Sequence, residues 1–353
     1  HIVKRDNCPL LTKCALYLGA VVLALVLGAV LLMSLGVDPV AYYTRMFTMG
    51  TIGNKIAYKV WINYLKDFVP LALTSVALSL AFKMRFWNIG GEGQMLIGLL
   101  CAIIFALYSG MEGAISIPFI ILAGMIGGAV WGFFPGILKS KFGVSELLST
   151  VMFNYIATCI VGILLQTSLK DPANFFPQSA YMPEGMWLPY IITGTRLHSG
   201  LIVALVCAAL VYILVWRTKI GYDMRAVGLN ARACKCSGIS VSKSIILSAL
   251  LSGGLAGLAG VCEITGLQHR LMSGISPGYG YLAIITALLG RNHPVGIIVA
   301  SIGIAALQVG AQGMQRSGGV PNSIADIIMA VVVLLILARH ALEKVLKKKG
   351  GKA

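Results

Sequence analysis

Long runs of apolar residues are the feature that most constrains what this chain can fold into. About 20 consecutive apolar residues span the roughly 30 Å hydrocarbon core of a bilayer, and the first run, residues 14–36, has that length. Charged residues make up only 11% of the 353 residues, whereas soluble domains carry about 25%. The pattern predicts an all-α fold, a polytopic membrane helix bundle.

Ten apolar runs predict about ten transmembrane helices. They cover residues 14–36, 68–84, 94–110, 114–137, 146–168, 198–216, 244–263, 278–290, 295–314 and 321–339. The runs 68–84 and 278–290 are short, which is typical of tilted, broken or re-entrant segments. Residues 37–67 mix aromatic and basic side chains and predict an amphipathic element at the outer interface. Residues 170–197 contain four prolines and predict an irregular external loop.

The positions of the basic residues predict the orientation. With a cytoplasmic N-terminus, 20 of the 28 Lys and Arg residues fall on the cytoplasmic side, as the positive-inside rule expects. We therefore expect residues 1–13 to be a cytoplasmic segment, 14–340 a membrane domain with a cytoplasmic loop at 217–243, and 341–353 a basic cytoplasmic tail. The net charge of +16 is explained by this topology. No basic stripe carries the interleaved aromatic residues of a nucleic-acid-binding surface, so nucleic acid is not expected as a partner.

The chain lacks the common motifs of catalysis and cofactor binding. It contains no G-x-x-x-x-G-K-[ST] phosphate loop, no G-x-S-x-G and no H-E-x-x-H. Most of the eight cysteines lie within apolar runs and behave as small hydrophobes. Cys234 and Cys236 form a C-x-C pair without a nearby His, which does not make a zinc site. We expect no enzymatic activity, metal or cofactor in this chain.

Glycines repeat at helical spacing in two of the runs. They are Gly124, Gly128, Gly132 and Gly136, then Gly253, Gly257 and Gly260. Each set lies on one face of a helix. Small residues let membrane helices approach closely, so the two sets predict tight helix packing.

The loop 217–243 contains small and apolar residues that are unusual for a connection that meets only water, and this favours a protein partner. Its pattern is formed by Gly221, Arg225, Ala226, Val227, Gly228, Asn230, Ala233, Gly238 and Ile239. The pattern resembles the coupling loop of bacterial ABC importer permeases of the branched-chain amino acid and simple-sugar superfamily. The resemblance implies that these residues receive the stroke of a separate ATPase subunit.

A second motif resembles one branch of that superfamily. Residues 86–94, FWNIGGEGQ, are similar to the F-N-I-G-x-E-G-Q signature of nucleoside-type permeases linked to basic membrane proteins, with Trp87 as an extra residue and Gly91 where Ala is common. Stretches beginning at Gly143, Leu251, Ala287 and Val320 are similar as well. The resemblance covers residues 68–340.

This resemblance implies a multi-pass subunit of a bacterial inner membrane that works by alternating access. Its partners are a second homologous permease, a cytoplasmic ATPase that holds ATP and Mg, and an extracytoplasmic binding lipoprotein. Nucleosides are the commonest cargo of the branch, and related ring compounds are carried by other members.

Polar residues inside apolar runs are the candidates for the substrate pathway, because an ionisable side chain at mid-bilayer costs at least about 2.5 kcal/mol unless it faces protein or water. The candidates are Asn88, Glu92, Gln94, Glu146, Asn154 and Tyr155. Amides and hydroxyls suit a neutral, hydrogen-bonding cargo, and aromatic rings stack on a base. Helix capping explains Glu92 and Glu146 equally well, since each lies at the start of an expected helix.

Three other functions fit the composition. An ion-coupled secondary transporter would use Glu92, Glu146 or Asp326 as a proton or sodium site. A simple-sugar importer permease and an integral membrane enzyme are the other two. The carboxylates near the ends of the runs and the docking-type loop favour the ABC permease.

Overall fold

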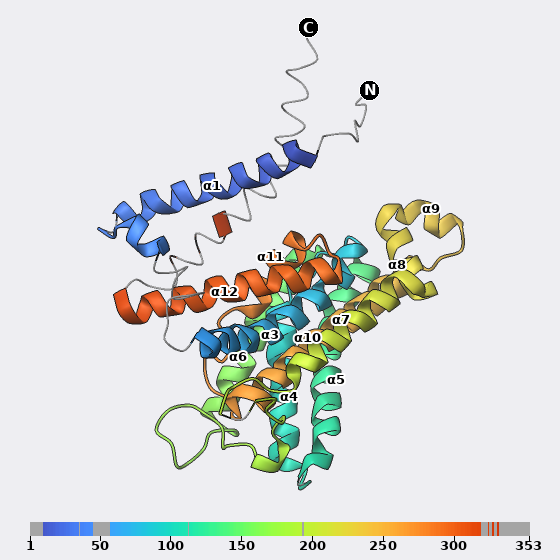
Figure 1. Ribbon diagram of the computed structural model, residues 1–353. Helices are drawn as coiled ribbons and strands as arrows, with labels where there is room; N and C mark the ends of the chain where they lie inside the picture. Colours follow the sequence, from blue (N-terminus) through green and yellow to red (C-terminus); the bar gives the residue numbers. More distant parts are fainter. Residues whose placement is uncertain are drawn as a thin grey trace. The chain divides into compact units, whose positions relative to one another are not determined.

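The computed structural model describes residues 10–34, 36–44, 57–111, 113–192 and 194–318, with residues 324, 327, 330 and 331. Within these residues, β structure is limited to two isolated bridges. The helices (Figure 1) are α1 Leu10–Ser34, α3 Ala57–Lys83, α4 Gly91–Tyr108, η1 Ala114–Ser116, α5 Ile117–Phe142, α6 Glu146–Gln166, η2 Glu184–Met186, α7 Gly200–Arg217, α8 Lys219–Leu229, α9 Ala231–Cys236, α10 Val241–Glu263, the π-helix η3 Ile264–Gln268, α11 Tyr279–Leu289 and α12 Pro294–Gly318.

Six helical segments of the described chain are long and apolar enough to cross a membrane. They are Tyr64–Lys83, Gly91–Tyr108, Ala114–Phe142, Glu146–Gln166, Gly200–Arg217 and Val241–Gln268. Shorter apolar helices cover Leu25–Ser34, Tyr279–Leu289 and Pro294–Gly310. These helices confirm a polytopic membrane helix bundle but not a count of ten spans. The expected span 321–339 lies outside the described residues, apart from four of its positions.

The expected boundary before the second span was wrong. Residues 57–67, which were expected to belong to an interfacial element, instead form the first part of α3, a single helix of 27 residues. Lys59, Lys66 and Asp67 lower the hydropathy of this stretch, although Asp67 is buried in the folded chain. The run 278–290 does form a short helix, α11, of 11 residues.

The chain divides into two compact units. Residues 1–60 and 306–353 make up the first unit, in which Leu32 and Tyr42 pack with Ile324. The second unit, Trp61–Ala305, contains the six long spans.

Close packing of α5 on α10 forms the centre of the second unit, with α4 against both. A Cβ atom at Gly128 would lie 2.3 Å from the carbonyl oxygen of Gly253, and one at Gly257 would lie 2.4 Å from that of Gly124. Because any side chain there would force the backbones apart, both predicted glycine faces are confirmed as helix contacts.

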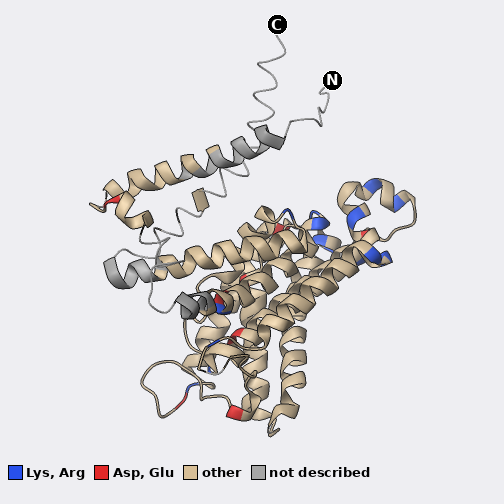
Figure 2. Ribbon diagram, in the orientation of Figure 1, with Lys and Arg blue, Asp and Glu red and all other residues tan. Residues whose placement is uncertain are grey.

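The two ends of this unit differ in charge. The end formed by the termini of α3, α5 and α7, with α8 and α9, carries most of its Lys and Arg residues (Figure 2) and is called the basic end. The opposite end, called the loop end, is covered by the irregular segment 167–199, whose described residues contain one short 3₁₀ helix. This segment matches the irregular loop expected from its prolines.

Candidate functional site

The expected coupling loop folds into α8 and α9, joined by a sharp corner at Asn230. The Thr218 hydroxyl caps α8 by accepting a hydrogen bond from the Gly221 amide at 3.2 Å. The Asn230 side chain caps α9 by accepting from the amides of Arg232 and Ala233, both at 3.1 Å. Such caps satisfy donors that a helix start leaves without partners, so the corner is defined locally by sequence.

Two glycines let this loop lie directly on the membrane helices. A Cβ at Gly221 would be 2.1 Å from the carbonyl oxygen of Leu214 in α7, and one at Gly228 would be 2.3 Å from that of Lys83 at the end of α3. α8 therefore lies in direct backbone contact with α7 and with the end of α3.

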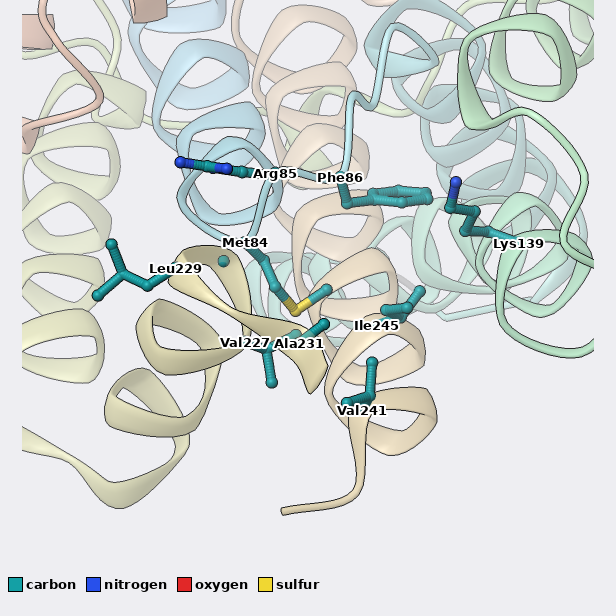
Figure 3. A pocket seen from close by; sticks show the side chains of 10 residues that line it. Met84, Arg85, Phe86, Lys139, Val227, Leu229, Ala231, Val241 and Ile245 are labelled. Carbon is teal, nitrogen blue, oxygen red and sulfur yellow. The ribbon is translucent and has the colours of Figure 1, made fainter. Parts of the chain in front are cut away.

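A pocket of about 270 Å³ lies beside this contact (Figure 3). It is lined by Met84, Arg85, Phe86, Lys139, Val227, Gly228, Leu229, Ala231, Val241 and Ile245. Its wall is largely apolar, with two basic residues among the lining. Among the lining residues Leu229 is 78% exposed, and Tyr222 and Ile220 of α8 are exposed too. Exposed apolar side chains on a loop beyond the membrane helices are typical of a protein contact.

The chain between Phe86 and Gly91 runs from the basic end into the bundle, where α4 begins. Phe86 lines the pocket at the basic end, while a Cβ at Gly91 would touch Thr74 and Leu78 of α3 at 3.2 Å. Thr74 precedes Lys83 by nine residues, which is about 14 Å of helix. The start of α4 is therefore buried deep between other helices.

Side chains from α6 satisfy the amide groups at this buried helix start. Thr150 accepts a hydrogen bond from the Ile89 amide at 3.3 Å, and Asn154 accepts from the Gly93 amide at 2.9 Å. The Asn154 amide nitrogen also donates to the Ile89 carbonyl at 3.0 Å. Water is absent from the bilayer core, so a helix start at this depth needs such partners.

Asn88 and Gln94 form a reciprocal pair inside the same junction. Each amide nitrogen donates to the oxygen of the other amide at 3.0 Å. Asn88 also donates to Ser252 of α10 at 3.0 Å and accepts from the Gly90 amide. All of these side chains are buried. The pair ties α4 to α10.

Glu92 links the start of α4 to the start of α11. It lies in the first turn of α4, and its Oε2 accepts a hydrogen bond from the Gly280 amide of α11 at 2.7 Å. The hydroxyl of Ser276 accepts from the Gly278 and Tyr279 amides. A carboxylate is favoured at the positive end of a helix dipole, and here one carboxylate serves two helix starts.

Two further buried acidic side chains lie nearer the loop end, and one of them, Asp67, was unrecognised from the sequence. Asp67 accepts a hydrogen bond from the Tyr279 hydroxyl at 3.1 Å and pairs with Lys66 at 2.9 Å. Glu263, also buried, accepts from Gln268 at 3.1 Å. From the sequence, Asp67 was assigned to the interfacial segment 37–67 because its neighbours in sequence are charged.

At the loop end, His269 and His198 are both buried. The His269 ring stacks on Trp187 at 3.9 Å and lies 3.0 Å from the Tyr190 hydroxyl. These contacts make His269 part of the packing at the loop end. Burial lowers the pKa of His269. Burial, followed by the charge of His269, lowers the pKa of His198 to about 4.

Comparison with known proteins identifies this architecture. Residues 60–337 match the family described as branched-chain amino acid transport system / permease component. The chain belongs to this permease family. No solved structure matches the permease.

Two relatives of the permease are named as guanosine or nucleoside transporter permeases. It is 33% identical to the guanosine ABC transporter permease protein NupP of Bacillus subtilis, over 94% of this chain and 96% of the relative. It is 31% identical to the nucleoside ABC transporter permease protein NupB of Lactococcus lactis, over 95% and 96%. The glucose ABC transporter permease protein TsgB13 of Haloferax volcanii is 32% identical, over 90% and 85%.

The residues predicted to line a substrate pathway lie in different environments. Asn88, Gln94 and Asn154 are buried and hydrogen-bonded within the permease, and Glu92 is buried at the two helix starts. Glu146 begins α6, as expected, and pairs with Lys139 at 2.6 Å. Tyr155 alone is largely exposed. Their roles in transport stay predictions.

The predicted ATPase-coupling residues are spread over α8, α9 and the turn after them. Gly221, Val227 and Gly228 pack toward the membrane helices and are buried. Arg225, Ala226, Asn230 and Ala233 are partly or fully exposed, and Gly238 has a positive φ of 80° in the turn before α10. Leu229 was among the small and apolar residues that favoured a protein partner, whereas sequence reasoning omitted Tyr222; these are the most exposed apolar side chains of the loop. Their contact with an ATPase is likewise a prediction.

Proposed function

We propose that this permease carries nucleosides into the cell as one membrane-spanning subunit of an ATP-driven importer. The observation that carries the proposal is similarity over almost the whole chain to a guanosine and a nucleoside permease. Its partners are a cytoplasmic ATPase, which holds ATP and Mg, a second homologous permease and an extracytoplasmic binding lipoprotein. The chain itself performs no catalysis.

The coupling step follows from the packing at the basic end. The ATPase contacts the exposed face of α8 and α9, where Leu229 and Tyr222 lie. Its motion reaches α3 and α7 through the close contacts of Gly228 and Gly221. The basic end faces the cytoplasm in this proposal, with both termini on the same side.

Uptake by the native complex in proteoliposomes tests the cargo. Guanosine, adenosine, uridine and glucose are offered with ATP inside the vesicles and the binding lipoprotein outside. Nucleoside uptake that stops without ATP is the expected result. Glucose uptake alone would instead support the sugar function named for one relative. Uptake driven by a proton gradient without ATP would falsify the importer proposal.

The coupling contact is tested by Leu229→Asp, with the exposed Phe175→Asp at the loop end, outside the membrane-spanning segments, as the control. The expected result for Leu229→Asp is lower nucleoside uptake together with loss of the ATPase on co-purification, whereas the control should retain the ATPase. Retention of the ATPase by Leu229→Asp contradicts the assignment of this face.

A further inference from the structure

One exposed face of α6 is polar in the half that approaches the loop end. Tyr155, Thr158 and Gln166 are all exposed there, and their spacing of three and eleven residues places them on one side of the helix, together with the exposed thiol of Cys159. The adjoining exposed residues Met152, Ile156 and Ile163 are apolar, as expected for contact with lipid.

Tyr155 stands at the middle of the membrane-spanning helix. It is the tenth of the 21 residues of α6 and is 67% exposed. A hydroxyl at this depth has no water partner if it faces lipid. The polar face of α6 is therefore expected to meet water, cargo or protein rather than acyl chains.

Tyr281 of α11 is bonded to the residue that precedes Tyr155 in α6. Its hydroxyl accepts a hydrogen bond from the Asn154 amide at 3.4 Å, which places this hydroxyl at the depth of residue 154. Tyr281 is 43% exposed. Two exposed tyrosines from different helices thus lie at a similar depth in the membrane-spanning part.

The buried side of this surface determines the kind of ligand that fits. The starts of α4 and α11 meet at Glu92, and helix starts attract anions. Glu92 lies in the first turn of α4 and accepts a hydrogen bond from the Gly280 amide in the first turn of α11. A side chain of the permease therefore already fills the place that an anionic group of the cargo would take, whereas a neutral, flat ring is compatible.

We infer that Tyr155 and Tyr281 form the surface on which the heterocyclic ring of the cargo stacks during transport. Asn154 positions Tyr281, and the polar face from Thr158 to Gln166 continues the path toward the loop end. The inference rests on the proposed nucleoside function and assigns the residues that contact the cargo. Tyr155 was already a pathway candidate from the sequence, whereas Tyr281 was not.

The native thiol of Cys159 reports on this surface, because it lies one helical turn from Tyr155. The native complex is treated with a small thiol reagent in the presence and absence of guanosine, and modification of each cysteine peptide is followed by mass spectrometry. Guanosine is expected to slow modification of Cys159 severalfold. Cys236, exposed on α9, is the internal control and should react at the same rate in both samples.

Substitutions separate ring stacking from hydrogen bonding. Loss of one stacking ring costs roughly tenfold in affinity, so Tyr281→Leu and Tyr155→Leu are expected to raise the KM for guanosine about tenfold. Tyr281→Phe keeps the ring and should stay within about twofold of the native KM. Tyr108→Leu, at an exposed tyrosine on the last residue of α4, is the matched control and should transport normally.

The outcomes distinguish this inference from the proposed function. If the native complex imports guanosine but Cys159 reacts equally fast with and without it, the inference is overturned and the importer proposal stands. A native KM in both leucine variants overturns it as well. The Cys159 measurement uses the unsubstituted chain, so it tests the inference even if a leucine variant fails to assemble. A native complex that imports no nucleoside refutes the proposed function itself.

Discussion

Asn154 holds together the buried junction at the start of α4. Its side chain binds the Gly93 amide, the Ile89 carbonyl and the Tyr281 hydroxyl. A single amide therefore bonds backbone groups on both sides of a helix start, and no leucine-sized apolar group can replace those bonds.

Asn154→Leu is expected to destabilise the permease by roughly 2 kcal/mol, because buried polar groups lose their partners. This corresponds to a fall in Tm of roughly 3 °C for a chain of this size. Thermal unfolding of the purified chain in detergent measures it. Gln166→Leu, the same amide-to-leucine change at an exposed position of α6, should leave the Tm unchanged. Equal Tm values for both variants would show that the junction does not depend on Asn154.

His198 is held neutral at the loop end. Its Nδ1 accepts a hydrogen bond from the Gly200 amide at 3.1 Å, and its pKa of about 4 lies below the ordinary value near 6.5. The unfolded chain therefore binds a proton more readily than the folded chain between these two values, so acid favours unfolding.

The contribution of neutral His198 to the free energy of unfolding should be fully present above pH 6.5 and should decline as the pH falls toward 4. The largest loss is about 3 kcal/mol, at about 1.4 kcal/mol per unit of pKa difference. Unfolding curves between pH 7 and 4.5 measure it. His198→Asn keeps an acceptor near the Gly200 amide but cannot be protonated, so its acid-induced loss should be smaller. A native-like pH dependence in this variant would assign the effect to other groups.

The helix pair α5 and α10 depends on the absence of side chains at specific positions. Gly128 faces both Gly253 and Gly257 across the contact, whereas Gly162 in α6 has no atom within 4 Å of its missing Cβ. Two glycines in membrane-spanning helices thus have opposite surroundings.

Gly128→Ala should force the two helices apart and cost about 1–3 kcal/mol of stability. Gly162→Ala meets open space in this chain and is expected to be neutral or to stabilise by about 0.5–1 kcal/mol. The Tm values of the two purified variants give the comparison. If alanine is tolerated equally at both positions, the close approach of α5 and α10 does not limit stability.

Helices and their packing faces were predictable because they depend on local hydropathy and spacing. The start of α3 was missed because Lys59, Lys66 and Asp67 resemble interfacial residues until their partners are known. The role of Glu92 depends on Gly280, which is 188 residues away in sequence. Asn154 is buried and the adjacent Tyr155 is exposed. The sequence of α6 does not predict this difference, because it depends on which side of α6 the neighbouring helices cover.

At the scale of the whole molecule, charge separates the two ends of the second unit. The basic end carries the loop of α8 and α9, while the loop end carries the segment in which Phe175 is 92% exposed. Lys and Arg concentrate on the cytoplasmic side of membrane proteins. The loop end is therefore expected to be accessible to reagents outside the cell, and the basic end is not.

A membrane-impermeant maleimide tests this orientation on intact cells that express the permease alone. Cys236 on α9 is exposed and should remain unmodified until the membrane is opened. A cysteine introduced by Phe175→Cys should react at once from outside, because the loop end faces that side. Mass spectrometry of the two peptides from the same cells makes each position the control for the other. Reaction of Cys236 in intact cells would reverse the orientation, and the ATPase could then no longer reach α8 and α9.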